Sequence, residues 1–142
     1  MMWLEPLLAG TVVLVADQFS KQHVLAQRHY AGAVEHRPFF SIRCIINRRT
    51  AVMSLLGGWM LMAAWILCAA FALFSLTQEP LARSLVGAIG IGLAMGGITG
   101  NYIDMLRRGG IVDFIAIGSW PVFNLADAAV VSGLALALQA LV

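Results

Sequence analysis

Long stretches without any charged residue constrain this chain more than any other feature. No Asp, Glu, Lys or Arg occurs between Arg49 and Glu79, or between Arg83 and Asp104. A transmembrane helix needs about 20 apolar residues, and each interval can hold one. A water-soluble domain needs a charged surface, but only 11% of these residues are charged and 61% are hydrophobic. The sequence therefore predicts an all-α integral membrane protein.

Four apolar runs predict four transmembrane helices in a single domain, residues 1–142. We place the spans at about residues 4–22, 52–76, 84–104 and 124–142. The second and third are clear from their length and lack of charge, whereas the first contains Asp17 and the fourth includes Asp127 near its start. The first run has no basic segment before it and no small-residue cleavage site after it. We interpret it as a retained helix and not as a cleaved signal peptide.

Polar connections separate these runs. In the long connection, residues 23–50, apolar and polar residues roughly alternate from Phe39 to Ile46, which predicts a short strand. The last connection, residues 105–123, is rich in turn-forming residues. These are Gly109, Gly110, Gly118 and Pro121. With four spans, both termini share one side of the membrane, and these two connections share the other.

The third predicted span is rich in glycine. Gly92, Gly96 and Gly100 recur every four residues, so they share one face of a helix. Small residues on one face let two helices approach closely in lipid. Such a face fits either a dimer interface or packing within the chain, and we favour packing within the chain.

All Asp and Asn residues of the chain fall at predicted helix ends or in the two long connections. They are Asp17, Asn47, Asn101, Asp104, Asp113, Asn124 and Asp127. An Asp at the centre of a membrane helix costs about 2.5–3.5 kcal/mol on insertion scales, so such residues are rarely present without a role. Their common side predicts one polar site near one membrane interface.

Helical spacing pairs several of these residues. Asn101 and Asp104 are three apart and share a helix face. Asp17 and Lys21 are four apart, which predicts an ion pair that closes the first helix.

Asn124 and Asp127 repeat the three-residue spacing at the start of the last span. Asn124 suits an N-cap, which puts Asp127 at the third helical position. Two carboxylates brought close together share one proton, so one can act as a base and the other as an acid. That is the chemistry of an aspartic peptidase. From spacing alone, a purely structural set of caps and ion pairs stays open.

Other classes of site have little support. A net charge of +2 without a long basic tract predicts no nucleic-acid partner. His23, His29 and His36 lie in one connection without cysteine or carboxylate at ligand spacing, so we expect no metal. Cys44 lies in a polar connection and Cys68 in an apolar run, so we expect no disulfide between them.

Four ordered blocks of this chain resemble signal peptidase II, the bacterial prolipoprotein peptidase family. They are residues 17–21 (DQFSK), 47–56, 96–104 with 111–114, and 120–127 (WPVFNLAD). The first block is weak by itself. The third and fourth, in the correct order within a four-span chain, are highly specific, and the resemblance extends over nearly the whole length.

The resemblance implies four transmembrane helices with a small extracytoplasmic β-cradle and an interfacial helix. It implies an aspartic endopeptidase that removes the signal peptide from diacylglyceryl-modified prolipoproteins by cleaving before the lipidated cysteine. Asp113 and Asp127 match the catalytic pair. The positions that match supporting or substrate-binding residues are Asp17, Lys21, Asn47, Asn101, Asp104 and Asn124. No metal or cofactor is implied; the expected partners are prolipoproteins and membrane lipids, and we expect a monomer.

The resemblance also implies a bacterial inner-membrane protein with cytoplasmic termini and an active site towards the extracytoplasmic leaflet. The distribution of basic residues argues for the opposite orientation, because cytoplasmic loops usually carry the excess of Lys and Arg. Only Arg83 lies on the side of the termini. The basic residues of the other side are Lys21, Arg28, Arg37, Arg43, Arg48, Arg49, Arg107 and Arg108. We adopt the orientation that the resemblance implies.

Two positions depart from the family pattern. Arg49 stands where the family has glycine, and Met105 stands where an arginine normally follows Asp104. Arg107 and Arg108 are the candidate substitutes, but we expect an arginine two or three positions later to point elsewhere. These departures leave open a divergent homologue that processes one dedicated lipidated partner, or a catalytically inactive membrane subunit. A transporter or channel subunit is disfavoured, because polar residues on one side offer no path across the bilayer.

Overall fold

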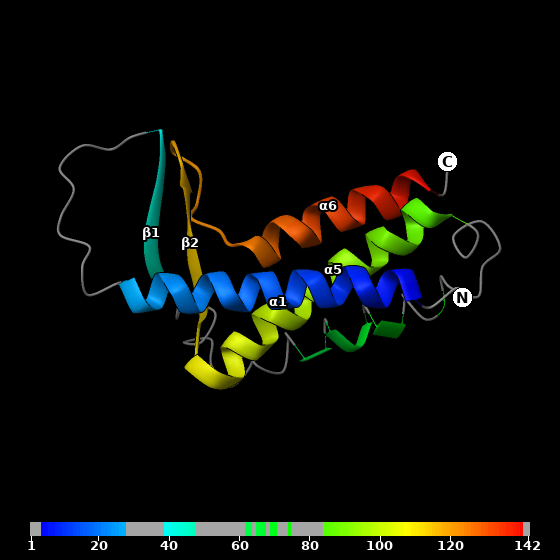
Figure 1. Ribbon diagram of the computed structural model, residues 1–142, viewed down its shortest axis with the longest axis horizontal. Helices are drawn as coiled ribbons and strands as arrows, with labels where there is room; N and C mark the ends of the chain where they lie inside the picture. Colours follow the sequence, from blue (N-terminus) through cyan, green and yellow to red (C-terminus); the bar gives the residue numbers. More distant parts are fainter. Residues whose placement is uncertain are drawn as a thin grey trace.

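The computed structural model describes residues 4–27, 39–47 and 84–140, together with 62–63, 65–67, 69–70 and 74. The named elements of this part are three helices and two strands. They are α1 (Leu4–Gln27), β1 (Phe40–Asn47), α5 (Leu85–Arg108), β2 (Ile111–Ile117) and α6 (Leu125–Gln139). The helices lie side by side, and the strands cross one end of the bundle (Figure 1). The fold is therefore mostly helical with a small two-stranded sheet.

Three predicted spans coincide with helices. α1 and α5 run past the predicted ends at residues 22 and 104, and α6 follows Asn124. Within the described residues, Leu85–Arg108 is the one helix long and apolar enough to cross a membrane, and Leu125–Gln139 is a shorter apolar helix. The count of four spans therefore stays a prediction.

Most of the second predicted span, 52–76, lies outside the described residues. Its described residues are helical. Trp65 Nε1 donates a hydrogen bond to Thr99 Oγ1 of α5 at 3.0 Å, which places Trp65 against α5. The expected interfacial helix is not among the elements that the described ranges contain.

Local sequence explains where the helices begin and end. Ser84 caps α5 by accepting a hydrogen bond from the Gly87 N–H at 3.1 Å. α5 ends at Arg108, and its C-cap Gly109 has a φ of 63°, in the left-handed region that favours glycine. Asn124 and Asp127 form a reciprocal capping box at the start of α6, which confirms the predicted N-cap.

α5 is the central helix, and it packs against α1 on one side and α6 on the other. A Cβ added to Gly96 would lie 2.4 Å from the carbonyl oxygen of Gly10 in α1. A Cβ added to Gly90 would lie 2.6 Å from the carbonyl oxygen of Gly133 in α6. Backbones this close require glycine, so the predicted packing of the glycine face within the chain is confirmed.

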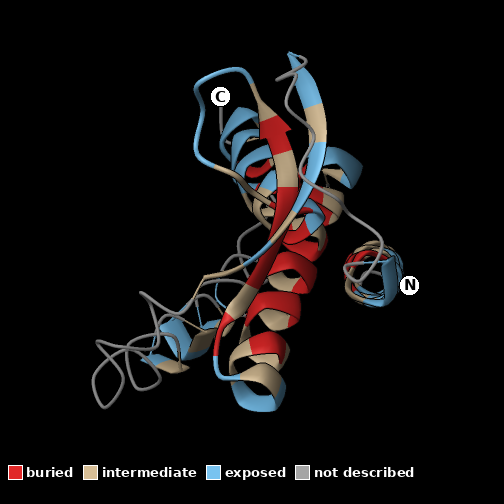
Figure 2. Ribbon diagram, turned by 90° about the vertical axis from the view of Figure 1, so that its left-hand side faces the viewer, coloured by how far each residue is buried: buried red, intermediate tan, exposed pale blue. Residues whose placement is uncertain are grey.

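The sheet pairs β1 and β2 in antiparallel register, from Phe40 with Ile117 to Asn47 with Ile111, with an irregularity between Ile42 and Ile45. β1 confirms the strand predicted from alternation. β2 lies in a segment that we expected to be only a connection. β2 is largely buried, and β1 is its more exposed neighbour (Figure 2).

Candidate active site

All the candidate site residues meet in one hydrogen-bonded and ionic network at the end of the bundle that carries the sheet. Each element contributes to this network. The contributions are Asp17 and Lys21 from α1, Asn47 from β1, Asn101 and Asp104 from α5, Asp113 from β2, and Asn124 and Asp127 from the start of α6. The prediction that these residues lie together in one polar site is confirmed, and their roles in catalysis stay a prediction.

Asn124 holds both members of the predicted catalytic pair. Its side-chain Nδ2 donates to Asp113 Oδ1 at 2.8 Å, and its backbone N–H donates to Asp127 Oδ2 at 3.1 Å. Asn124 is wholly buried and Asp113 is 6% exposed, whereas Asp127 is partly exposed. The start of α6 therefore places Asp127 beside β2. The Asp113 carboxylate is buried, whereas the Asp127 carboxylate is open to a ligand.

The other oxygen of each carboxylate also accepts a hydrogen bond. Asn101 Nδ2 donates to Asp127 Oδ1 at 2.8 Å, and Asn47 Nδ2 lies 3.4 Å from Asp113 Oδ2. All four carboxylate oxygens are thus oriented by donors from three different elements. Such preorganisation fixes the geometry of a site before a substrate arrives.

The environment of Asp113 favours its protonated form. Burial raises the pKa of Asp113 above its usual value of 3.8, and the negative charge of Asp127 raises it further. Hydrogen bonds from Asn124 and Asn47 and the charge of Lys21 oppose this rise. A carboxyl that keeps its proton beside a second carboxylate can act as an acid.

A buried ionic cluster lies next to the pair Asp113 and Asp127. Lys21 Nζ lies 2.7 Å from Asp17 Oδ2 and 2.8 Å from Asp104 Oδ2, and all three side chains are fully buried. Lys21 also donates to Asn101 Oδ1 at 3.0 Å, so it orients the amide that binds Asp127. A buried lysine needs such partners, because an unpaired charge is costly to bury.

The ion pair between Asp17 and Lys21 is present, but the prediction that it closes the first helix is wrong. α1 continues to Gln27. The two side chains turn inward to α5 and α6 instead, where Asp17 Oδ1 accepts a hydrogen bond from the Ala126 N–H at 3.0 Å. Their role is to join helices.

Sequence reasoning missed two members of the cluster, Gln18 and Arg108. Gln18 Nε2 lies 3.2 Å from Asp104 Oδ1 and donates to the Gly100 carbonyl at 3.1 Å. Arg108 Nη1 forms an ion pair with Asp104 Oδ1 and lies 3.4 Å from Gln18 Oε1. Arg108 thus reaches Asp104 itself, whereas the expectation that it does not take the place of an arginine at position 105 stays a prediction. The four-residue spacing from Asp104 was the available signal.

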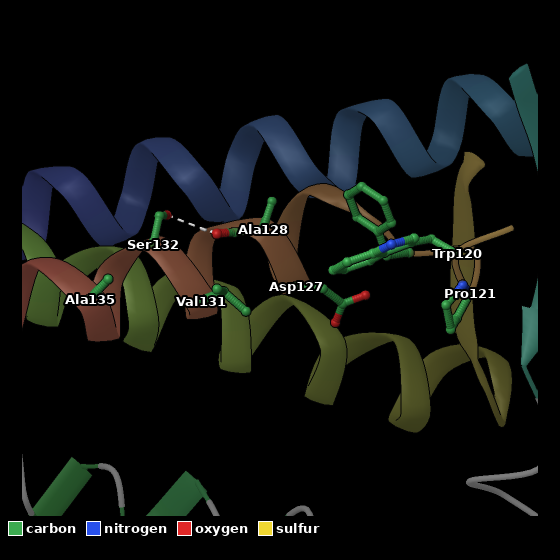
Figure 3. Close-up of a pocket in the computed structure, with 8 residues that line it drawn as sticks. Trp120, Pro121, Asp127, Ala128, Val131, Ser132 and Ala135 are labelled. Atoms are coloured by element: carbon green, nitrogen blue, oxygen red, sulfur yellow. Dashed lines mark hydrogen bonds between the residues drawn. The ribbon is translucent and has the colours of Figure 1, made fainter. Parts of the chain in front are cut away.

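An apolar pocket of about 500 Å³ opens beside Asp127. Its lining residues are Trp120, Pro121, Phe123, Asp127, Ala128, Val131, Ser132 and Ala135. In Figure 3, Asp127 lies between Val131 and the Trp120–Pro121 corner. A second pocket, of about 400 Å³, shares Trp120 and Phe123 and is lined by Phe39 of the sheet region. A carboxylate at the edge of an apolar pocket suits an apolar ligand with a reactive polar bond.

In the part of the chain that the structure describes, no three His, Cys, Asp or Glu residues are arranged to hold a metal ion. Four positions named in the sequence analysis for metal binding, a disulfide or the family pattern lie outside the described residues. They are His29, His36, Cys68 and Arg49.

Comparisons of the sequence with known proteins point to one family. The sequence profile of the family described as Signal peptidase (SPase) II matches residues 9–142. The lipoprotein signal peptidase of Shewanella amazonensis is 36% identical over 134 residues, which cover 86% of this chain and 77% of that protein. That of Azoarcus sp. is 33% identical over 149 residues, which cover 94% of this chain and 80% of that protein.

Solved structures extend the likeness to the fold. A bacterial membrane enzyme determined at 1.9 Å by the in meso method matches with a TM-score of 0.78 and 25% identity, over 96% of this chain and 92% of that one. A second, determined at 2.3 Å, matches with a TM-score of 0.77 and 26% identity, over 96% of this chain and 86% of that one. This chain belongs to the signal peptidase II family.

Proposed function

We propose that this protein is an aspartic endopeptidase that removes signal peptides from diacylglyceryl-modified prolipoproteins by cleaving before the lipidated cysteine. Membership of the family supports a lipoprotein signal peptidase. The observation that carries the aspartic mechanism is the pair Asp113 and Asp127, both held by Asn124 at distances of 2.8 and 3.1 Å. In this proposal Asp113 and Asp127 are the catalytic residues, and the rest of the network supports them.

The two carboxylates divide the work of acid and base. We assign the resting proton to Asp113, because burial and the neighbouring charge raise the pKa of that carboxyl. Asp127 lies in the first turn of α6, where the helix end stabilises a negative charge. Asp127 is therefore the base and Asp113 the acid in the first step.

The proposed reaction needs no group beyond this pair and a water molecule. Asp127 takes a proton from water while the water oxygen bonds to the scissile carbonyl carbon, and Asp113 gives its proton to the carbonyl oxygen. The neutral tetrahedral diol then collapses. Asp127 returns its proton to the amide nitrogen, the C–N bond breaks, and a diol hydroxyl returns a proton to Asp113. The pair ends in its starting state.

The pocket beside Asp127 supports a lipidated or strongly apolar substrate. Its wall is made by Trp120, Phe123 and Val131, and Asp127 is the one carboxylate among the described residues that line it. An apolar chain that fills this pocket places its polar, reacting part at the edge nearest Asp127. Membrane lipids are the other expected contacts, because Phe19 and Val12 of α1 and Val131 of α6 are more than 60% exposed.

We further propose a monomer in the bacterial inner membrane, with the site towards the extracytoplasmic leaflet. The sheet and the catalytic pair lie at one end of the bundle, whereas α1 begins and α6 ends at the other (Figure 1). This arrangement supports a site at one membrane surface. A monomer is supported by the glycine faces of α5, because Gly96 packs on Gly10 of α1 and Gly90 on Gly133 of α6 within the same chain.

The test is cleavage of a diacylglyceryl prolipoprotein by purified wild-type, Asp113→Asn and Asp127→Asn proteins. Both variants keep the size of the side chain and remove its acid–base function, so we expect kcat to fall by about 100-fold or more. Glu5→Gln is the matched control, because Glu5 is a carboxylate in the first turn of α1. It should cleave at the wild-type rate.

The same assay separates the alternatives. Wild-type turnover by both variants would contradict the aspartic mechanism. Cleavage of several unrelated prolipoproteins by the wild type would argue against a homologue dedicated to one lipidated partner. Failure to cleave any of them would favour a catalytically inactive membrane subunit.

A further inference from the structure

Asp104 connects the ionic cluster to the strand that carries Asp113. It is fully buried, and its two carboxylate oxygens serve different partners. Oδ2 lies 2.8 Å from Lys21 Nζ and accepts a hydrogen bond from the Val112 N–H at 3.2 Å. Oδ1 pairs with Arg108. One carboxylate therefore joins α1, α5 and β2.

Val112 is held through both of its backbone polar groups. Its N–H donates to Asp104, and its carbonyl oxygen lies 3.3 Å from Asn124 Nδ2. The side chain of Val112 is 0% exposed. Because Asp113 is the next residue along β2, the orientation of the Val112 backbone sets where the Asp113 carboxylate lies.

Arg108 balances the charge of the cluster. The fully buried Asp17 and Asp104 face the fully buried Lys21, and the 17% exposed Arg108 supplies the second positive charge. The guanidinium group also approaches Gln18 Oε1 at 3.4 Å, which directs Gln18 Nε2 to Asp104 and Asp17. Without Arg108 the cluster has one unmatched negative charge, and Asp104 Oδ1 keeps only the neutral amide of Gln18.

We propose that Arg108 is a positioning residue for Asp113, acting through Asp104 and the Val112 peptide. It holds Oδ1 of Asp104 so that Oδ2 stays on the Val112 N–H. Removing one partner of a buried ion pair leaves an uncompensated charge, which rearranges to find another partner. The other cation of the cluster is Lys21, which already contacts Oδ2. Rotation of the carboxylate to bring the unpaired Oδ1 to Lys21 takes Oδ2 off the Val112 N–H. The kinetic consequence rests on the proposed function, whereas the effect on β2 does not.

The first test measures amide hydrogen exchange in residues 111–114 of detergent-solubilised Arg108→Met protein. We expect exchange there to be about tenfold faster or more, because the protecting hydrogen bond to Asp104 opens more often. The matched control is Arg107→Met, which removes the same charge from an exposed neighbour. Arg107→Met should exchange like the wild type. Unchanged exchange in Arg108→Met, or an equal increase throughout the chain, would overturn the proposal.

The second test compares the steady-state kinetics of the same proteins on a diacylglyceryl prolipoprotein. A displaced catalytic group lowers the rate by about 10- to 100-fold, so kcat should fall while KM stays near the wild-type value. Arg108→Lys keeps the charge and should recover part of both kcat and exchange protection. A fall in KM alone, or a wild-type kcat, would count against a positioning role.

The two tests distinguish a failure of the Arg108 proposal from a failure of the proposed function. If the wild type and all Arg108 variants are inactive, the peptidase proposal fails, but the exchange measurement still decides the role of Arg108. If the wild type cleaves, Asp113→Asn does not, and Arg108→Met behaves as the wild type in both tests, the peptidase stands and this inference falls.

Discussion

At the scale of single residues, Asn124 both caps a helix and binds a member of the proposed catalytic pair. Its Oδ1 accepts the Asp127 N–H at 2.9 Å as the cap of α6, and its Nδ2 reaches Asp113 at 2.8 Å. The cap was predictable, because it depends on local sequence. The bond to Asp113 was not, because it depends on how β2 folds against α6. Side chains that serve both purposes are hard to assign from sequence by itself.

The pH dependence of activity follows from the environment of Asp113. Burial first, and the Asp127 charge second, raise the pKa of the Asp113 carboxyl. The proposed reaction needs one carboxylate of the pair ionised, and their coupling makes the apparent pKa values properties of the pair. A raised pKa moves proton loss to higher pH. On the basic side, kcat/KM should therefore fall as Asp113 loses its proton at a pH above the usual aspartate range.

Asn47→Ala tests this assignment. Asn47 donates to Asp113 Oδ2 at 3.4 Å and lowers the pKa of that carboxyl, so its removal should raise the pKa further. The basic limb of the kcat/KM profile should then move to higher pH. Ser41→Ala, on the same strand, should leave the limb in place. A shift to lower pH in Asn47→Ala would reverse the assignment of the proton to Asp113.

At the scale of elements, α5 owes its central place to glycines on two faces. Gly96 meets Gly10 of α1, and Gly90 meets Gly133 of α6. The four-residue spacing of Gly92, Gly96 and Gly100 made the first face predictable. The second face has no comparable repeat, so it emerged only from the structure.

Gly96→Ala should destabilise the protein, although alanine normally stabilises a helix by about 1 kcal/mol relative to glycine. The new Cβ would lie 2.4 Å from the Gly10 carbonyl oxygen, so α1 and α5 must separate. Overpacking of this kind costs about 1–3 kcal/mol. The measurement is the thermal unfolding midpoint in detergent. Val86→Ala, at a position 45% exposed on the same helix, is the control. An unchanged or higher midpoint for Gly96→Ala would contradict the close packing.

The two strands show where sequence patterns stop being informative. β1 alternates between apolar and polar residues, so its sequence indicates a strand. β2 is almost uniformly apolar, broken only by Asp113, and a short apolar run does not distinguish a strand from a helix or a buried loop. Pairing with β1 settles its conformation. The same pairing sets Asp113 opposite Ile45, two residues before Asn47.

At the scale of the whole molecule, the buried cluster weakens the charge argument about orientation. The positive-inside rule counts basic residues in short loops near the membrane. Lys21 is fully buried between Asp17 and Asp104, and Arg108 is paired with Asp104. Two of the eight basic residues on the side of the site are therefore neutralised inside the fold. They act as structural cations and carry little information about topology.

Ser119 offers a direct test of the proposed orientation. It is exposed within the turn that follows β2, at the end of the molecule that carries the site. In a Cys44→Ser, Cys68→Ser background, Ser119→Cys should react in intact cells with a maleimide that does not cross the inner membrane. Glu5→Cys, at the opposite end of α1, should react only after the membrane is permeabilised. The reverse pattern would place the catalytic pair in the cytoplasm, where the six remaining basic residues of that side would satisfy the positive-inside rule.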